Sequence, residues 1–175
     1  MHALEDGKTD IRDMPFPLRT LKGSGDRFYK EALRYHRYSR NKGPLWETLQ
    51  LLYSDIWKLP PSSPMRKPLF ILYADMSADL KVQLEQGILG GIMDVRDFPF
   101  ELRNSPEYGR ILWIYSFRVL RYSPDTSQFR EVLELLESDY LSQPEGSPLR
   151  NRLEDLCERY AAELERLEKK RNELI

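Results

Sequence analysis

Apolar side chains recur at helical spacing along most of the chain. The clearest run covers residues 44–59, where Leu45, Trp46, Leu49, Leu52, Tyr53, Ile56 and Trp57 follow one another every three or four positions. This spacing places apolar side chains on one face of a helix, where they can pack against a core. We therefore predict a helix over residues 44–59, with both tryptophans packed inside.

Further helices are predicted over residues 26–42, 68–87, 106–122, 125–141 and 147–174. Start signals support them: Pro44, Pro106 and Pro148 suit a first helical position, Ser147 suits an N-cap, and either Asp125 or Thr126 suits the N-cap of the helix before it. Residues 87–105 are predicted to form a structured loop. Because strand patterns are rare, we predict an all-α fold, a compact bundle of five to six helices with a long C-terminal helix.

The first 25 residues mix charges with glycine and proline and predict an irregular N-terminal arm. The segment 15–18 is expected to be extended, because a residue that precedes proline avoids the helical region. Phe16, Leu18 and Leu21 are expected to hold the arm against the helical domain over residues 26–175. No internal repeat with a period of 20–50 residues is evident.

Composition indicates a folded protein, with 41% hydrophobic and 31% charged residues and a formal net charge of −1. A single cysteine, Cys157, excludes an internal disulfide and favours a reducing cytoplasm. No apolar run reaches the roughly 20 residues of a membrane span, and the N-terminus lacks the apolar region of a secretory signal. We expect a cytoplasmic protein without membrane contact.

Residues 22–42 carry a concentration of positive charge. Seven of the 27 Lys and Arg residues lie here, against two acids: Lys22, Arg27, Lys30, Arg34, Arg37, Arg40 and Lys42. On a helix, the four from Arg27 to Arg37 form one stripe of mutually repelling charges. Two interpretations stay open: a surface for an anion such as a phosphate backbone, and a solvated face whose charges are neutralised by acids elsewhere.

The helix predicted over residues 106–122 is apolar nearly all round and should be buried. It also carries Arg110, Arg118 and Arg121, which share one face. Burying an unpaired arginine is costly, so these side chains must emerge at a groove or pair with acids.

Catalytic motifs are absent from the sequence. It contains no phosphate-binding glycine-rich loop and no nucleophile elbow. Two histidines and one cysteine do not suffice for an ordinary structural zinc site. The acid pairs Asp75/Asp79 and Asp94/Asp97 fit helix exteriors and caps, His36 fits a surface or nucleic-acid contact, and Cys157 fits a packed thiol. We predict a protein that is not an enzyme and has no metal or cofactor.

Three segments resemble the small subunit of a type I-D CRISPR Cascade effector complex: FPLRTLKGSGDRFYKEALRYHRYSR, PLWETLQLL and ILWIYSFRVLRY. That family corresponds to the C-terminal helical part of the large subunit, made separately from an internal start. The resemblance implies a non-catalytic subunit of an RNA-guided DNA surveillance complex for antiviral defence. Its partners would be guide RNA, target DNA, the backbone and large subunits, and neighbouring copies of itself.

The resemblance also implies which residues bind. Sequence-independent contacts with target and displaced DNA strands would come from the stripe Arg27, Lys30, Arg34 and Arg37 and from Arg118 and Arg121. The alternative is a helical protein-interaction or scaffold subunit that pairs through the leucines of residues 149–174. The least favoured alternative is a nuclease that uses Asp94, Asp97 and a metal ion.

Overall fold

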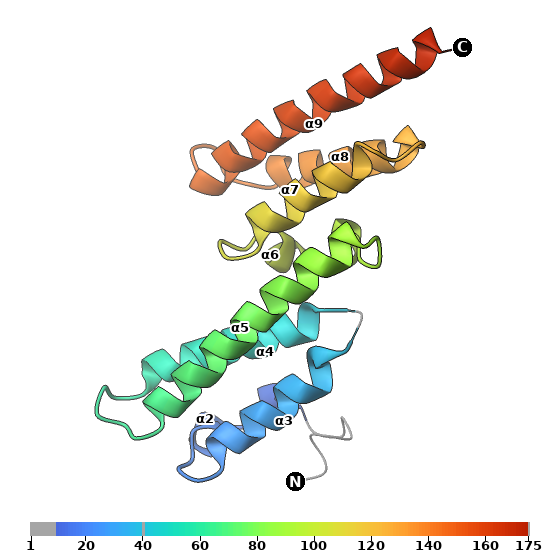
Figure 1. Ribbon diagram of the computed structural model, residues 1–175. Coiled ribbons are helices and arrows are strands. Elements are labelled where there is room, and N and C mark those ends of the chain that lie inside the picture. Colours follow the sequence, from blue (N-terminus) through green and yellow to red (C-terminus); the bar gives the residue numbers. More distant parts are fainter. Residues whose placement is uncertain (1–9, 40, 175) are drawn as a thin grey trace. The chain divides into compact units, whose positions relative to one another are not determined.

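A computed structural model describes residues 10–39 and 41–174. These residues form eight α-helices, two short 3-10 helices and no strand, so the predicted all-α fold is confirmed (Figure 1). Six of the helices have 12 or more residues. The long C-terminal helix is confirmed as well, since α9 (Pro148–Glu173) has 26 residues.

Most helices follow the predicted bounds. The remaining elements are η1 (Ile11–Asp13), α2 (Phe16–Arg19), α3 (Gly25–Arg37), α4 (Gly43–Lys58), α5 (Arg66–Leu89), η2 (Val95–Asp97), α6 (Phe100–Arg103), α7 (Gly109–Leu120) and α8 (Thr126–Leu141). The predicted caps are confirmed at two helices, because Asp125 accepts the N–H of Ser127 and Ser147 accepts the N–H of Arg150. Local capping signals therefore located these helix ends.

The chain divides into two units, residues 1–83 and 84–175, with the boundary inside α5. Residues 10–83 align without a gap with residues 94–167, and 26 of the 74 aligned positions carry the same residue. Each element of the first unit has its counterpart 84 positions later: η1 and η2, α2 and α6, α3 and α7, α4 and α8, α5 and α9. The chain is thus a tandem repeat with a period of 84 residues. This period is longer than the 20–50 residues over which no repeat is evident.

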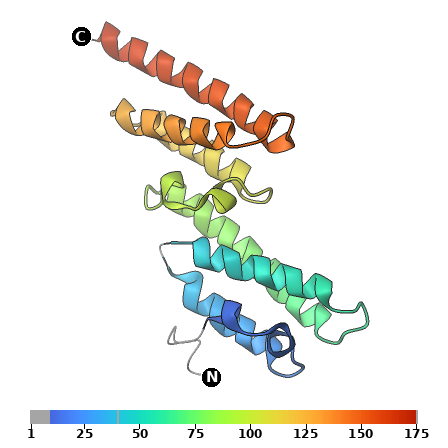
Figure 2. The same cartoon turned by 180° about the vertical axis from the view of Figure 1, so that it is seen from behind.

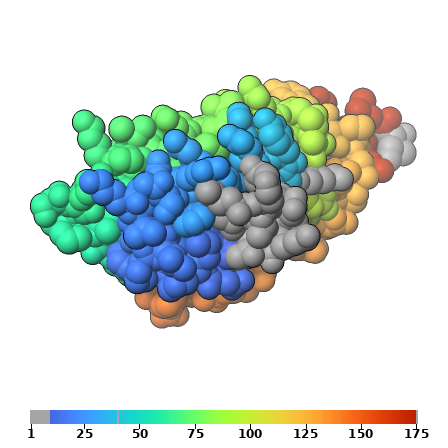
Figure 3. Space-filling model, turned by 90° about the horizontal axis from the view of Figure 1, so that it is seen from below, coloured from blue at the N-terminus to red at the C-terminus, as the bar shows by residue number. Residues whose placement is uncertain are grey.

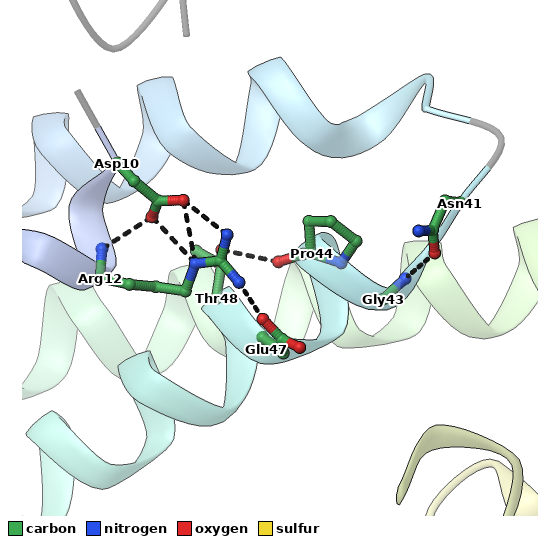
Figure 4. A network of polar contacts seen from close by, with 7 residues as sticks. All are labelled: Asp10, Arg12, Asn41, Gly43, Pro44, Glu47 and Thr48. Atoms are coloured by element: carbon green, nitrogen blue, oxygen red, sulfur yellow. Dashed lines mark hydrogen bonds and ion pairs between the residues drawn. The ribbon is translucent and has the colours of Figure 1, made fainter. Parts of the chain in front are cut away.

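The segment in which the two copies agree best lies near the start of each unit: DIRDMPFPLR at residues 10–19 and DVRDFPFELR at residues 94–103. In the first unit, Asp10 accepts the backbone N–H of Arg12 at 2.8 Å, and the Arg12 guanidinium bridges Asp10 and Glu47 of α4 (Figure 4). In the second unit, Asp94, Arg96 and Glu131 of α8 repeat this network. The conserved residues therefore fasten each 3-10 turn to the helix beside it.

A buried ion pair closes each unit. Arg19 donates from Nε to the Asp55 carboxylate at 2.7 Å, and Tyr29 of α3 donates its hydroxyl to the same carboxylate. At the equivalent place Arg103 donates to Asp139 at 2.6 Å, joined by an amide N–H from Asn104 at 2.8 Å. Both carboxylates lie inside the protein, with exposed fractions of 0% and 3%. Buried charges of this kind persist only when paired.

A glycine is conserved where each first long helix begins. A Cβ on Gly25 would stand 2.5 Å from the carbonyl oxygen of Arg19, and one on Gly109 would stand 2.8 Å from that of Arg103. Both obstacles are backbone atoms, which cannot move aside without displacing α2 or α6. The glycines thus let the helix start pack directly against the segment that carries the buried arginine.

The core of each unit is built from the inward faces of its three long helices. The fully buried side chains include, in the first unit, Ile11, Tyr29, Leu33, Leu45, Leu49, Leu52, Ile56, Leu69 and Leu80, and in the second, Leu102, Leu112, Trp113, Phe129, Leu136, Leu153 and Tyr160. Within the second unit α8 and α9 run side by side (Figure 1, Figure 2). The loop Gly146, at φ +79°, precedes α9 and allows that reversal.

The helix predicted to run to residue 42 ends at Arg37, and the helix predicted to begin at Pro106 begins at Gly109. Two further predictions of local structure are wrong. Residues 15–18 are not an extended arm, because Phe16–Arg19 form α2 with Pro15 as its extended N-cap. Pro17 is tolerated there because N–H groups in a first turn have no helical acceptor. Buried Ile11 and the Arg19–Asp55 ion pair hold the segment against the rest of the unit. Of the predicted anchors, Phe16 is partly buried, whereas Leu18 and Leu21 are 45% and 51% exposed. The predicted division into an arm over 1–25 and a domain over 26–175 also differs from the two repeated units.

The second error concerns Trp57, which is 58% exposed and not in the core. The core takes the stripe of Leu45, Leu49, Leu52 and Ile56, all at most 1% exposed. Trp57 and Tyr53 belong to the neighbouring stripe, about 100° further around the helix, which lies at the edge of the packed face.

Candidate nucleic-acid interface

α3 lies at the surface of the first unit (Figure 3, blue). Its inner face buries Tyr29, Ala32 and Leu33, which fixes the opposite face toward solvent. As predicted, that face carries Arg27, Lys30 and Arg34, and Lys22 is exposed just before the helix. Within the described residues Lys22, Lys30 and Arg34 have no ion-pair partner, so three of these charges remain free for an external anion.

The other charges of the stretch have internal partners or lie elsewhere. Arg27 pairs with Glu31 at 3.4 Å across one helical turn, although its side chain is 62% exposed. Arg37 pairs with Asp79 of α5 at 3.1 Å. Lys42 does not face solvent as the prediction required, because it is 3% exposed and donates to the carbonyl oxygen of Arg37. Burial lowers the pKa of Lys42 below its usual value. Arg40 lies outside the described residues.

On α7 the two predicted arginines differ from each other. Arg118 is exposed, with its guanidinium 5.4 Å from the ring centre of Tyr115. Arg121 lies 3.6 Å from the carboxylate of Glu163 on α9 and over the ring of Tyr122 at 5.3 Å. As the sequence predicted, arginines on this apolar helix either emerge at the surface or pair with an acid.

The repeat connects these arginines with those of α3. Arg34 and Arg37 are the counterparts of Arg118 and Arg121, within the motif Arg-x-x-Arg-Tyr-Ser that ends α3 and recurs at the end of α7. The ion pair recurs too, since Asp79 is the counterpart of Glu163. In both units the motif tyrosine, Tyr38 or Tyr122, is 80% exposed beneath an arginine 5.3 Å away. These two tyrosines were absent from the predicted site, and the repeated motif is the signal that identifies them.

Charge separates the two units sharply. Residues 10–83 hold 13 Lys and Arg against 8 Asp and Glu, a net charge of +5, whereas residues 94–167 hold 10 against 15, a net charge of −5. The near-neutral total therefore hides a basic and an acidic copy of one fold. An anionic partner is attracted to the first copy, which carries the exposed residues of α3.

The candidate catalytic groups have structural partners. Asp94 and Asp97 form the cap of η2. Burial acts to raise the pKa of Asp94, but hydrogen bonds from Arg96 outweigh it, so the pKa lies below its usual value. Burial lowers the pKa of His36, which packs edge-on against Tyr35. Burial and nearby acids raise the pKa of Cys157 to about 11. Among residues 10–39 and 41–174, no cluster of three or more His, Cys, Asp or Glu side chains could hold a metal ion.

No helix among the described residues is long and apolar enough to cross a membrane. Comparisons with models of protein families, with curated proteins and with solved structures found no match for this chain.

Proposed function

We propose that this chain is a non-catalytic binding protein whose first unit contacts nucleic-acid phosphates through Lys22, Lys30 and Arg34. The observation that carries the proposal is that these side chains are exposed and unpaired within the described residues, in a repeat copy, residues 10–83, of net charge +5. Lysine and arginine contacts with phosphate do not depend on base sequence. Arg118 and the exposed Tyr122 add a second, weaker set of contacts from the acidic unit.

The narrower proposal is the role of small subunit in a type I-D CRISPR Cascade complex. It is supported by the resemblance of the segments around α3, α4 and α7. Few free charges on a nearly neutral chain suit a subunit that steadies a strand held by its neighbours. Binding by the isolated protein should then be weak and strongly dependent on salt.

Replacing Lys30 and Arg34 by alanine is expected to weaken binding of a single-stranded oligonucleotide at every salt concentration. Each lost contact with a single strand flattens the plot of log affinity against log salt by about 0.7, so the double variant should lose about 1.4. Fluorescence anisotropy at several salt concentrations measures this slope. The control is Lys169→Ala with Lys170→Ala, which removes the same charge from the exposed end of α9. An unchanged slope for the α3 variant, or an equal loss for the control, would contradict the proposal.

A second candidate function, protein interaction, is favoured by an exposed apolar patch on the first unit. The patch comprises Tyr53 and Trp57 of α4 and Phe70 and Ile71 of α5, between 42% and 58% exposed. Their counterparts in the second unit are Glu137, Leu141, Glu154 and Asp155. Since the second copy folds without it, the patch is not a requirement of the fold, and exposed patches of this kind often bind proteins. By contrast, Leu153, Tyr160 and Leu164 of the predicted α9 seam are buried within their own unit.

A photo-reactive phenylalanine placed at position 57 is expected to cross-link a protein partner in cells of the native host. The same residue at position 141, the exposed counterpart in the second unit, is expected to give no such product. Denaturing gels of the affinity-tagged protein would show the difference. Equal cross-linking at both positions would remove the support for this second function.

A further inference from the structure

A pocket of about 200 Å³ lies within the second unit, between the α6–α7 segment and α9. Apolar side chains form much of its lining: Trp113, Ile114, Leu149, Leu153 and Leu156. Trp113 is 1% exposed and fixed in place, because its indole N–H donates to the side-chain oxygen of Asn104 at 3.1 Å and its ring packs edge-on against Tyr160. The apolar part of the pocket is therefore preformed, as in small-molecule sites generally.

Three arginines line the same pocket: Arg110 from α7 and Arg152 and Arg159 from α9. All three are exposed, and none forms a hydrogen bond or an ion pair within residues 10–39 and 41–174. The one acid of the lining, Asp155, leaves an excess of two positive charges. This excess is notable in a unit whose net charge is −5.

The first unit serves as an internal control for these arginines. The counterparts of Arg110, Arg152 and Arg159 are Asp26, Pro68 and Asp75, so the fold forms without positive charge at these places. The counterparts of Leu153 and Leu156, in contrast, are again leucines, Leu69 and Leu72. The leucines are thus common to both copies of the fold, while the arginines are particular to the second unit.

From this combination we propose that the pocket binds a small amphiphilic anion, with an apolar chain against Trp113 and the leucines and a carboxylate or phosphate group at the arginines. Guanidinium groups bind both head groups through paired N–H donors. At about 30 Å³ for each water-sized group, the volume accepts about seven methylene or methyl groups. Octanoate matches that length. The proposal is independent of nucleic-acid binding, which involves the first unit.

Isothermal titration calorimetry on the full chain tests the proposal with four probes. Octanoate and octyl phosphate are expected to bind, and comparing them identifies the preferred head group. Butyrate is expected to bind about 250-fold more weakly than octanoate, since each of the four additional buried methylenes contributes about fourfold in affinity. Octyltrimethylammonium, with the same chain and a positive head, is expected not to bind.

Pairs of variants with the same change of charge test whether octanoate binds at this pocket. Arg152→Glu with Arg159→Glu should weaken octanoate binding at least tenfold, whereas Lys169→Glu with Lys170→Glu, the same charge change at the end of α9, should alter it less than twofold. Should the charge reversal impair folding, Arg152→Gln with Arg159→Gln replaces it and should still weaken binding severalfold. Equal binding of octanoate and butyrate, or unchanged binding by a folded arginine variant, would overturn the proposal. So would a lack of octanoate binding up to its solubility limit.

Discussion

Replacing Asp55 by alanine is expected to lower the free energy of unfolding by about 3–5 kcal/mol, because it removes one partner of a buried ion pair. Asp55 is fully buried and accepts hydrogen bonds from Arg19 and Tyr29. In the variant the Arg19 guanidinium, in a residue only 7% exposed, would keep its charge without an opposing carboxylate. A loss of this size is a large part of the stability of an ordinary domain.

Urea unfolding followed by circular dichroism measures the effect of Asp55→Ala. The control is Asp13→Ala, which removes an exposed carboxylate from the same conserved segment and should change stability by no more than about 0.5 kcal/mol. Asp139→Ala should reproduce the large loss in the second unit, where Arg103 would be left without its partner. If Asp55→Ala lowered the free energy of unfolding by less than about 1 kcal/mol, the ion pair would contribute no more than one ordinary hydrogen bond. That result would contradict its proposed role in stabilising the first unit.

Replacing Tyr160 by alanine is expected to cost a similar amount, about 3–5 kcal/mol, by opening a cavity in the second unit. Tyr160 is fully buried, and its ring centre lies 5.1 Å from that of Phe117 and 5.3 Å from that of Phe129. Its hydroxyl donates to the carbonyl oxygen of Trp113. The variant would lose both the ring contacts and this link between α9 and α7.

Tyr160→Phe separates these two contributions, because it keeps the ring and removes only the hydroxyl. It should cost about 1 kcal/mol, the usual worth of one hydrogen bond. Tyr122→Ala makes the same chemical change at an 80% exposed position and should leave stability within about 0.5 kcal/mol. Chemical denaturation of the three variants under one set of conditions provides the comparison. If Tyr160→Ala lowered the free energy of unfolding by no more than Tyr160→Phe does, the packing of the ring would not contribute to the stability of this core.

Local sequence signals predicted the helices well and their burial less well. Proline and cap residues located the starts of α4, α8 and α9, since capping depends on neighbours in the chain. Periodicity could not separate the buried stripe of α4 from the one beside it, because both are apolar. Only tertiary packing, in which α4 contacts α3 and η1, decides that Ile56 lies inside. Trp57 instead meets Arg66 at the surface, with its ring centre 4.9 Å from the guanidinium.

The candidate site was predictable in outline. Counting charges identified Lys30 and Arg34, which the structure leaves exposed and unpaired within the described residues. The counting could not show that Lys42 turns inward to the last turn of α3, or that Asp79, 42 residues further along the chain, pairs with Arg37. The sequence indicates such long-range pairs only through the repeat. Arg121 and Glu163 are spaced as Arg37 and Asp79 are, so one pair predicts the other.

The buried ion pairs have a consequence for how the chain reaches its native state. Both Arg19–Asp55 and Arg103–Asp139 join residues 36 positions apart, so each ion pair closes within its own copy of the fold. The same symmetry creates a hazard, because Arg19 would find an equally suitable carboxylate in Asp139 and a misassembled chain could form. The different aromatic residues of the two cores, such as Tyr29 in one and Trp113 in the other, work against a stable exchange of helices between them. The two copies therefore differ in their cores as well as in the charge of their surfaces.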